Sequence, residues 1–234
     1  MKKIFWWILI ILLSPVLLFV VLTVLLYLPP VQNWAVDKVA AIASEKTGMD
    51  ITVGHVNLSF PLDLSIDEFR VKKSQQPADT IADVERMIVD VQLWPLLESK
   101  VIINELEVTN TSLNTLDLVD AAQVKGRFSR LFMASKGIDL DKQTVELNGS
   151  RLEDAFFDIQ MADSIPEDTT TSEPTLWKIY VDSITVDRSD VVFHMPGDTM
   201  SVNAHMGNLT AREALIDLGT QTYKVGSVDW IHGA

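Results

Sequence analysis

The residues that could carry catalytic or metal chemistry are few and dispersed. The chain of 234 residues has no cysteine and four histidines, namely His55, His194, His205 and His232. None of these histidines shows the spacing of a zinc or nucleophile motif, and the sequence has no glycine-rich phosphate loop. His194 and His205 lie in consecutive predicted strands with Asp198 between them. That arrangement could gather metal ligands, although a lone histidine on a strand is more often a half-exposed surface residue.

The carboxylates are numerous but spread along strands and loops. The chain carries 32 Asp and Glu against 19 Lys and Arg, which gives a formal net charge of −13. Scattered carboxylates are typical of a solvated face rather than of a paired general acid and base. Such an acidic body is also repelled by nucleic acid. We therefore predict a protein that is not an enzyme, holds no metal or cofactor, and does not bind nucleic acid.

An uncharged apolar run occupies residues 4–28 and follows Lys2 and Lys3. At about 1.5 Å per residue the run is roughly 37 Å long, enough to span a bilayer with some tilt. The lysines before it and the lack of basic residues directly after it place the N-terminus in the cytoplasm. A cleaved signal peptide is the alternative, but its apolar region is shorter. The residues assigned to this single-pass anchor and its interfacial ends are Ile4, Trp6, Trp7, Pro15 and Tyr27.

A helix is predicted over residues 29–48, directly after the apolar run. Two prolines open it, and Gly48 provides the C-terminal stop. Val31, Ala35, Val39 and Ile42 fall on one face at helical spacing, so we expect a juxtamembrane amphipathic helix. After residue 50 the apolar period changes to two, which indicates strands to the end of the chain.

A spacing unit with apolar residues at positions 1, 3, 6 and 8 occurs five times. The first residue of its central pair is Gly54, Asp67, Asn104, Asp182 or Gly226. The central step of three would turn the second half of a strand to the wrong face unless an extra residue is accommodated, as in a β-bulge. Repeated bulges predict a curved sheet.

Four other segments complete the predicted organisation. We expect partial helix over 116–135 and a short helical stretch over 211–217. Residues 144–161 are predicted to form two strands around the turn Asn148-Gly149. Residues 163–175 are acidic, rich in threonine and contain two prolines, which is typical of a mobile loop.

The alternating strands give a sheet with one apolar and one polar face, and no long amphipathic helix follows residue 50 to cover the apolar one. Either the sheet closes as a sandwich or barrel, or it curls into an open groove that holds a hydrophobic ligand. Acyl chains suit a groove, since each buried CH₂ contributes about 0.8 kcal/mol. The candidate groove residues are Ile51, Val53, Val56, Leu58, Leu64, Ile66, Phe69, Val71, Val89, Val91, Leu93, Val101, Ile103, Leu106, Val108, Ile179, Val181, Ile184, Val186, Val225 and Val228.

The order of these features resembles the N-terminal region of the AsmA-like family, most closely its TamB branch. The segments that carry the resemblance are PPVQNWAVDKVAAIASEKTGMDITVGHVNLSFPLDLSIDEFRV and DTIADVERMIVDVQLWPLLESKVIINELEV. The resemblance covers residues 1 to about 115 and is only general beyond them. It implies a protein of the bacterial inner membrane with a periplasmic β-groove of the repeating type, implicated in moving phospholipids toward the outer membrane.

The expected organisation is therefore a cytoplasmic tip at 1–3, a transmembrane helix at 4–28, the helix at 29–48, and a periplasmic, mainly β AsmA-like domain at 49–234. Members of the TamB branch are much longer, so we expect this chain to be an N-terminal portion. The resemblance implies as partners the membrane, phospholipid acyl chains and an outer-membrane β-barrel assembly protein. The alternative function is a scaffold for assembling outer-membrane or secreted proteins with that barrel, and a closed, anchored sensor or adhesin also stays open.

Overall fold

The computed structural model of the chain describes residues 27–59, 63–74, 76–92, 95, 102–118, 122–139, 142–163, 176–198, 200–220 and 222–234. The predicted anchor residues Ile4, Trp6, Trp7 and Pro15 lie outside the described residues, and Tyr27 is the first described one. Across these ranges no helix has the length and apolar character needed to traverse a bilayer. The prediction of a transmembrane helix therefore stays a prediction.

The predicted helix after the apolar run is present as α2, Pro29–Thr47. Its prolines stand in the first turn, where a missing N–H costs no hydrogen bond. Gly48 ends it in the left-handed conformation, with φ 68°, and donates its N–H to Ser44 O at 2.9 Å. Helix and C-terminal stop are thus confirmed.

The rest of the described chain is mainly β, as predicted. Twelve strands form within the described ranges, in one sheet. They are β1 Met49–Thr52, β2 His55–Ser59, β3 Asp63–Lys73, β4 Gln76–Val91, β5 Ile103–Asn114, β6 Ala122–Asp139, β7 Thr144–Glu153, β8 Phe156–Met161, β9 Lys178–His194, β10 Ser201–Asp217, β11 Thr222–Lys224 and β12 Ser227–Gly233. A short 3₁₀ turn, Pro196–Asp198, joins β9 to β10.

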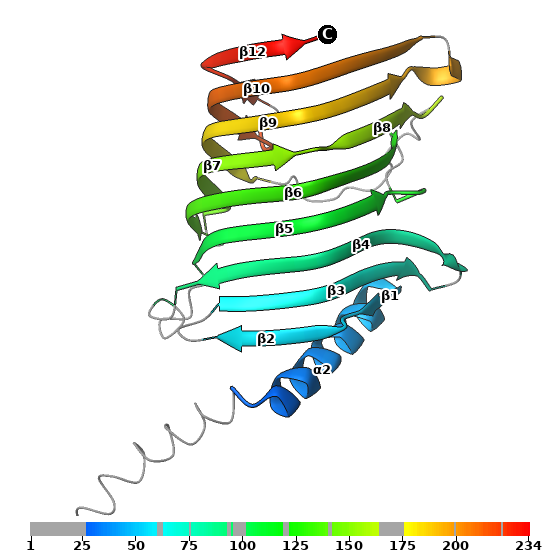
Figure 1. Cartoon of the computed structure of the whole chain (residues 1–234), viewed down its shortest axis with the longest axis vertical. Helices are drawn as coiled ribbons and strands as arrows, with labels where there is room; N and C mark the ends of the chain where they lie inside the picture. The colour runs from blue at the N-terminus through cyan, green and yellow to red at the C-terminus, as the bar shows by residue number, and fades with distance from the viewer. Residues whose placement is uncertain are drawn as a thin grey trace, which may run out of the picture.

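Neighbouring strands stack in an order that follows the chain, from the β1–β2 end to the β11–β12 end (Figure 1). Pairing is antiparallel except where β9 runs parallel to both β7 and β8. A parallel neighbour requires a connection that returns along the sheet. The residues between Met161 and Lys178 supply that connection, and they include the predicted mobile loop, of which 164–175 lie outside the described residues.

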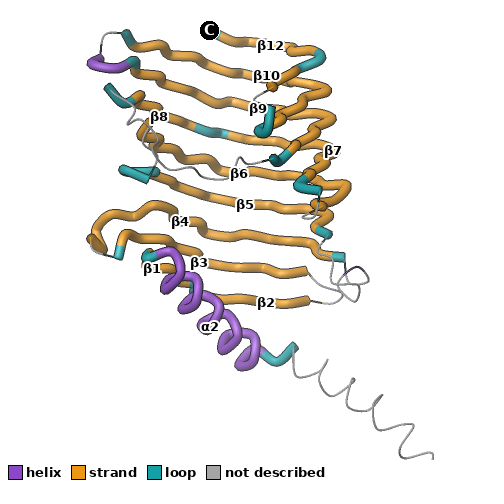
Figure 2. The backbone as a smooth tube through the Cα atoms, turned by 180° about the vertical axis from the view of Figure 1, so that it is seen from behind, coloured by secondary structure: helices purple, strands orange, loops and turns teal. Residues whose placement is uncertain are grey.

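Three pairs of short strands act as single bent strands. β1 with β2, β7 with β8, and β11 with β12 each pair along one long neighbour, which is β3, β9 and β10 respectively. The twelve strands therefore stack as nine layers. The long strands turn sharply near one side of the sheet, as Figures 1 and 2 both show.

The turns of successive strands line up in two rows across the sheet. The first bend row consists of Gly54, Glu68, Glu85, Asn110, Ser129, Asp154, Arg188, Gly207 and His232, and the second of Asn104, Asn148, Asp182, Glu213 and Gly226. In the first row Glu68, Asn110, Asp154, Arg188 and His232 have positive φ, between 46° and 57°. Polar residues with short or flexible side chains tolerate this left-handed conformation better than β-branched ones.

The predicted bulges are therefore present in a modified form. Asp67 pairs with Arg86 and Phe69 with Val84, so the ladder skips Glu68 and Glu85 together without a change of register. Both strands bend at the same place, and the apolar residues on each side stay on one face. A slip of one strand against its neighbour, as in a true bulge, occurs at Asn104, where Asp90 pairs with Glu105 but Val91 with Ile103.

Two predictions of helix are wrong, and one predicted turn is misplaced. Residues 122–139 and 201–217 are strands β6 and β10 where partial helix was predicted over 116–135 and 211–217. The two strands predicted over 144–161 are present as β7 and β8, but the break between them lies at Asp154 and Ala155, whereas β7 only bends at Asn148-Gly149, where its register against β6 shifts. In each case pairing on both sides decides the outcome, because β10 bonds to β9 along one edge and to β11 and β12 along the other.

Candidate functional site

The apolar side chains of successive strands stand opposite one another in cross-strand rows. We call the side of the sheet that carries them the apolar face. One row runs through Leu58, Leu64, Val89, Leu106, Met133, Ser150, Ile184, Ala211 and Val228. The next runs through Val56, Ile66, Met87, Val108, Leu131, Leu152, Val186, Leu209 and Trp230. Together these rows form a strip that crosses all nine layers with one polar member, Ser150.

Burial on the apolar face is greatest beside the first bend row. Val84, Val108, Phe128 and Ala155 form a cluster with exposed fractions of 3–9%. No second sheet is present among the described residues to cover them. They are buried because the strands bend toward this face, so that the parts of the sheet on the two sides of the first bend row cover them. The apolar face is therefore the concave one.

Away from that corner the apolar face stays partly accessible. Leu64, Val89 and Ile184 are neither buried nor fully exposed. The helix α2 contacts β1 and β2 at one end of the sheet, far from β9 and β10 (Figure 2). In the part of the chain that the structure describes, β1 and β2 do not pair with β11 or β12, so the sheet is not closed there.

One buried polar atom interrupts this face. The hydroxyl Oγ1 of Thr111 is buried without a hydrogen-bond partner, between Val84 and Phe128 in the register of the sheet. Ser189, which has no exposed surface, is satisfied instead, since its hydroxyl donates to Asp187 O at 2.9 Å and accepts from Ala155 N at 3.1 Å. Ser189 thereby provides a hydrogen-bond acceptor for the backbone N–H of Ala155, at the break between β7 and β8.

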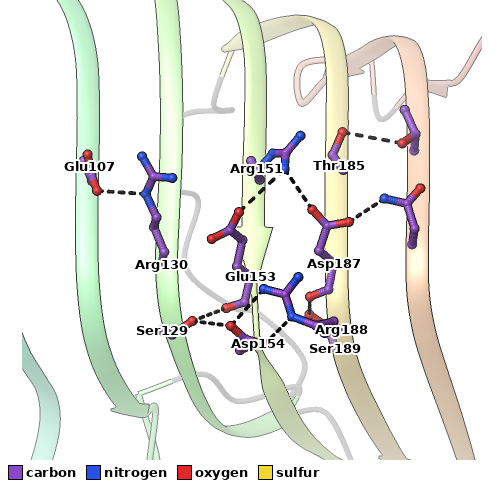
Figure 3. A network of polar contacts seen from close by, with 12 residues as sticks. Glu107, Ser129, Arg130, Arg151, Glu153, Asp154, Thr185, Asp187, Arg188 and Ser189 are labelled. Atoms are coloured by element: carbon purple, nitrogen blue, oxygen red, sulfur yellow. Dashed lines mark hydrogen bonds and ion pairs between the residues drawn. The ribbon is translucent and has the colours of Figure 1, made fainter.

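The opposite face is held together by charged pairs between neighbouring strands (Figure 3). Arg130 Nε donates to Glu107 Oε1 at 2.8 Å, from β6 to β5. Arg151 Nη1 lies 3.2 Å from Asp187 Oδ2, from β7 to β9. In the first bend row, Asp154 accepts from Ser129 Oγ at 2.9 Å and from Arg188 Nε at 2.7 Å. Water competes for most of these exposed pairs, so they contribute more to register than to stability.

Hydrogen bonds of this kind lower the pKa values of two carboxylates. Hydrogen bonds from Arg188 and then Ser129 hold the pKa of Asp154 below its usual range. The pKa of Asp217 is lowered mainly by the Thr220 backbone N–H, which outweighs the opposing effect of burial. Both carboxylates are therefore charged at neutral pH and act as fixed acceptors at a strand bend and a strand end.

A hollow of about 660 Å³ lies along the first bend row, lined mostly by polar residues but also by Phe128. Its lining mixes both charge signs, with Glu68, Glu85 and Asp154 beside Arg70 and Arg127. Arg70 is paired with Asp83, and Arg127 lies over the ring of Phe156, so the hollow offers no distinct binding chemistry. The organised feature of the molecule is the apolar face.

Most predicted groove residues lie on that face. The two halves of each spacing unit stay on one side because a bend row separates them, as Ile66 and Phe69 illustrate. Leu93 and Val101 lie outside the described residues. Val225, between β11 and β12, and Val228, on β12, are exposed, at 52% and 57%.

Several lining residues were missed by the sequence prediction, above all those of β6, β7, β8 and β10. They include Phe128, Leu131, Leu152, Phe157 and Leu209. The same spacing is present in β4, but with Glu85 at the centre, where Gly, Asp or Asn had been required. In β6 and β7 the spacing is interrupted by Gly126 and Ser150, whereas β10 fits it with Gly207 at the centre and was overlooked.

The histidines do not come together. His194 Nε2 lies 3.4 Å from Asp158 Oδ1, and His205 Nδ1 lies 2.7 Å from Asp190 Oδ1, so each pairs with a separate carboxylate. Among the described residues there is no group of three or more His, Asp or Glu that could hold a metal.

The chain matches no family model, and no curated protein matches it.

Proposed function

We propose that this chain is a membrane-anchored β-groove protein that carries phospholipid acyl chains along its apolar face, toward the outer membrane of a two-membraned bacterium. The observation that supports this is the continuous apolar strip on a bent, single-layer sheet whose concave side stays partly accessible. Membership of the AsmA-like family, on the resemblance described above, is part of the same proposal. The inner-membrane anchor at residues 4–28 and a periplasmic location for the β domain belong to it as well.

The dimensions of the strip suit an extended lipid tail. Neighbouring strands lie about 4.8 Å apart, so nine layers give a path of roughly 38 Å. The path runs perpendicular to the strands, from Leu58 at one end to Val228 at the other. A lipid tail on this strip would exchange water contact for side-chain contact at about 0.8 kcal/mol per CH₂. Its headgroup would remain in solvent at the open side.

Photo-crosslinking in membranes tests the proposal. A crosslinking amino acid at Leu106 or Ile184, both on the apolar face, should capture phospholipid. The matched control is Glu107, the neighbour of Leu106, whose side chain pairs with Arg130 on the opposite face. Labelling at Glu107 equal to that at Leu106, or none at either apolar position, would refute lipid occupancy of this face.

A second candidate function is an assembly scaffold that pairs with another β protein. It is favoured by the last strands of the sheet, where Tyr223, Trp230 and Ile231 are exposed by 67%, 51% and 53%. Such an edge can accept an added strand. Crosslinks from β12 to an outer-membrane barrel, together with lipid flux that is unchanged by charged substitutions on the apolar face, would favour this function over lipid transport.

A further inference from the structure

The helix α2 contacts the sheet on one side and is exposed to solvent on the other. One face is fixed to the first layer of the sheet by Gln32, which is 7% exposed. Its side-chain amide donates to Leu58 O at 3.3 Å and accepts from Leu58 N at 3.2 Å. Near the other end of the helix, Ser44 Oγ accepts from Ile51 N at 2.9 Å. The helix is therefore held along β1 and β2 and replaces the strand partner that this edge lacks.

Several large apolar side chains of α2 are in contact with solvent. Trp34, Val39 and Ile42 are exposed by 63%, 66% and 53%, and Leu28 just before the helix by 43%. Trp34, Lys38, Ile42 and Lys46 follow one another at four-residue spacing, so the two lysines border the apolar residues on the same side. Of the apolar stripe predicted for this helix, Val39 and Ile42 are exposed and Val31 is half-buried, whereas Trp34 was not predicted to belong to it.

The position of α2 in the chain indicates what covers these side chains. The helix starts one residue after the uncharged run 4–28, so a bilayer that holds the run lies within a few ångströms of the first turn of α2. Exposed tryptophan and aliphatic side chains with lysines beside them are residue types that also occur on helices in the membrane interface. The lysine stems can lie along the apolar surface while their ammonium groups reach the lipid headgroups.

We propose that α2 lies flat in the membrane–water interface, with Trp34, Val39 and Ile42 in the boundary between headgroups and acyl chains. This rests on the membrane anchoring in the proposed function, but not on lipid transport. It also deepens that function, because Gln32 bonds the backbone of Leu58, the first residue of the apolar strip. An α2 that lies on the bilayer places the start of the strip at the lipid surface and directs the stacked strands away from it (Figure 1).

Because the sequence contains no cysteine, a single introduced cysteine is the only site at which a thiol-reactive label can attach. Single cysteines replace Val39 in one variant of the full chain and Asp37 in another, and each is labelled with an environment-sensitive fluorophore. Asp37 is the matched control, since it is exposed on the same helix but lies on a different face. Both variants are reconstituted in vesicles of phosphatidylethanolamine and phosphatidylglycerol, with or without lipids that carry a nitroxide quencher on the acyl chain.

We expect the nitroxide lipids to quench the label at position 39 at least about twofold more strongly than the label at position 37, because only the former lies in the acyl boundary. Adding Ile42→Glu to the Val39→Cys variant should reduce that quenching by at least about half. Circular dichroism should be unchanged, since both positions are exposed. Equal quenching at positions 37 and 39, or none at 39, would overturn the proposal.

The same vesicles separate this inference from lipid transport. If phospholipid fails to crosslink at Leu106 while the label at position 39 is quenched, α2 lies on the membrane and the transport proposal fails alone. If crosslinking at Leu106 persists without quenching at position 39, the interfacial helix fails alone.

Discussion

Gly126→Ala should destabilise the sheet, although alanine normally suits a strand better than glycine. Gly126 in β6 pairs with Phe157 in β8 on the apolar face. A Cβ at position 126 would lie 2.5 Å from Phe157 Cδ1 and 3.4 Å from Leu113 Cδ1. Phe157 packs against the buried cluster at the corner, so its ring cannot move away without disturbing that cluster.

The balance of two effects sets the magnitude. Replacing glycine within a strand gains about 0.5–1 kcal/mol, because the unfolded chain loses conformational freedom. Forcing a packed ring off its position costs about 1–3 kcal/mol. The net expectation is a loss of about 1 kcal/mol in the free energy of unfolding, measured by denaturant titration of the full chain in detergent.

Gly149→Ala serves as the control. Gly149 also lies within a strand, but a Cβ there meets the Ser183 hydroxyl at 3.3 Å, a contact that a small shift relieves. This variant should be neutral or slightly more stable. Adding Phe157→Leu to Gly126→Ala should recover part of the loss. If Gly126→Ala proves as stable as Gly149→Ala, Phe157 does not lie over Gly126, and the packing described around the buried cluster is wrong.

Three further predictions concern polar groups. Thr111→Val should raise the free energy of unfolding by about 1 kcal/mol, as read from denaturant titration, because it removes a buried hydroxyl that has no partner and conserves shape. Gln32→Ala should accelerate hydrogen exchange of the Leu58 amide about tenfold, because the variant loses the two bonds that replace a strand partner; unchanged exchange would contradict that role. The pKa of Asp154 is lowered mainly by Arg188, so its stabilising contribution is present above the ordinary carboxyl pKa, about 3.8, and is lost as the pH falls through the lowered value. Asp154→Asn should therefore be less stable than the parent at pH 7, and the difference should disappear as the pH falls through the lowered pKa of Asp154; a difference that persists after the carboxyl is protonated would refute the assignment.

The two edges of the sheet differ in a way that bears on both proposed functions. The β1–β2 edge is covered by α2, whose Gln32 occupies backbone groups that an added strand would need. The β11–β12 edge has no such cover in the described residues, and its apolar residues are exposed. Growth of the sheet by strand addition can thus proceed at one end only, away from the edge that we place at the membrane.

Local sequence determined the features that depend on near neighbours. Pro29, Pro30 and Gly48 specify the start and end of α2, because ring geometry and the left-handed backbone act within a single turn. The spacing of Leu64, Ile66, Phe69 and Val71 specified a strand with one apolar face and an interruption at its centre. These patterns require only that side chains alternate and that water is excluded from one side.

Tertiary structure decided the features that depend on distant segments. Residues 211–217 contain good helix formers, yet they extend β10, because hydrogen-bonding partners on both sides outweigh differences in helix propensity of less than about 1 kcal/mol per residue. Asn148-Gly149 resembles a hairpin turn but lies within β7, between β6 and β9. The alignment of bends into rows, and with it the concave side of the apolar face, arises only when nine layers stack in one register. No single strand contains that information.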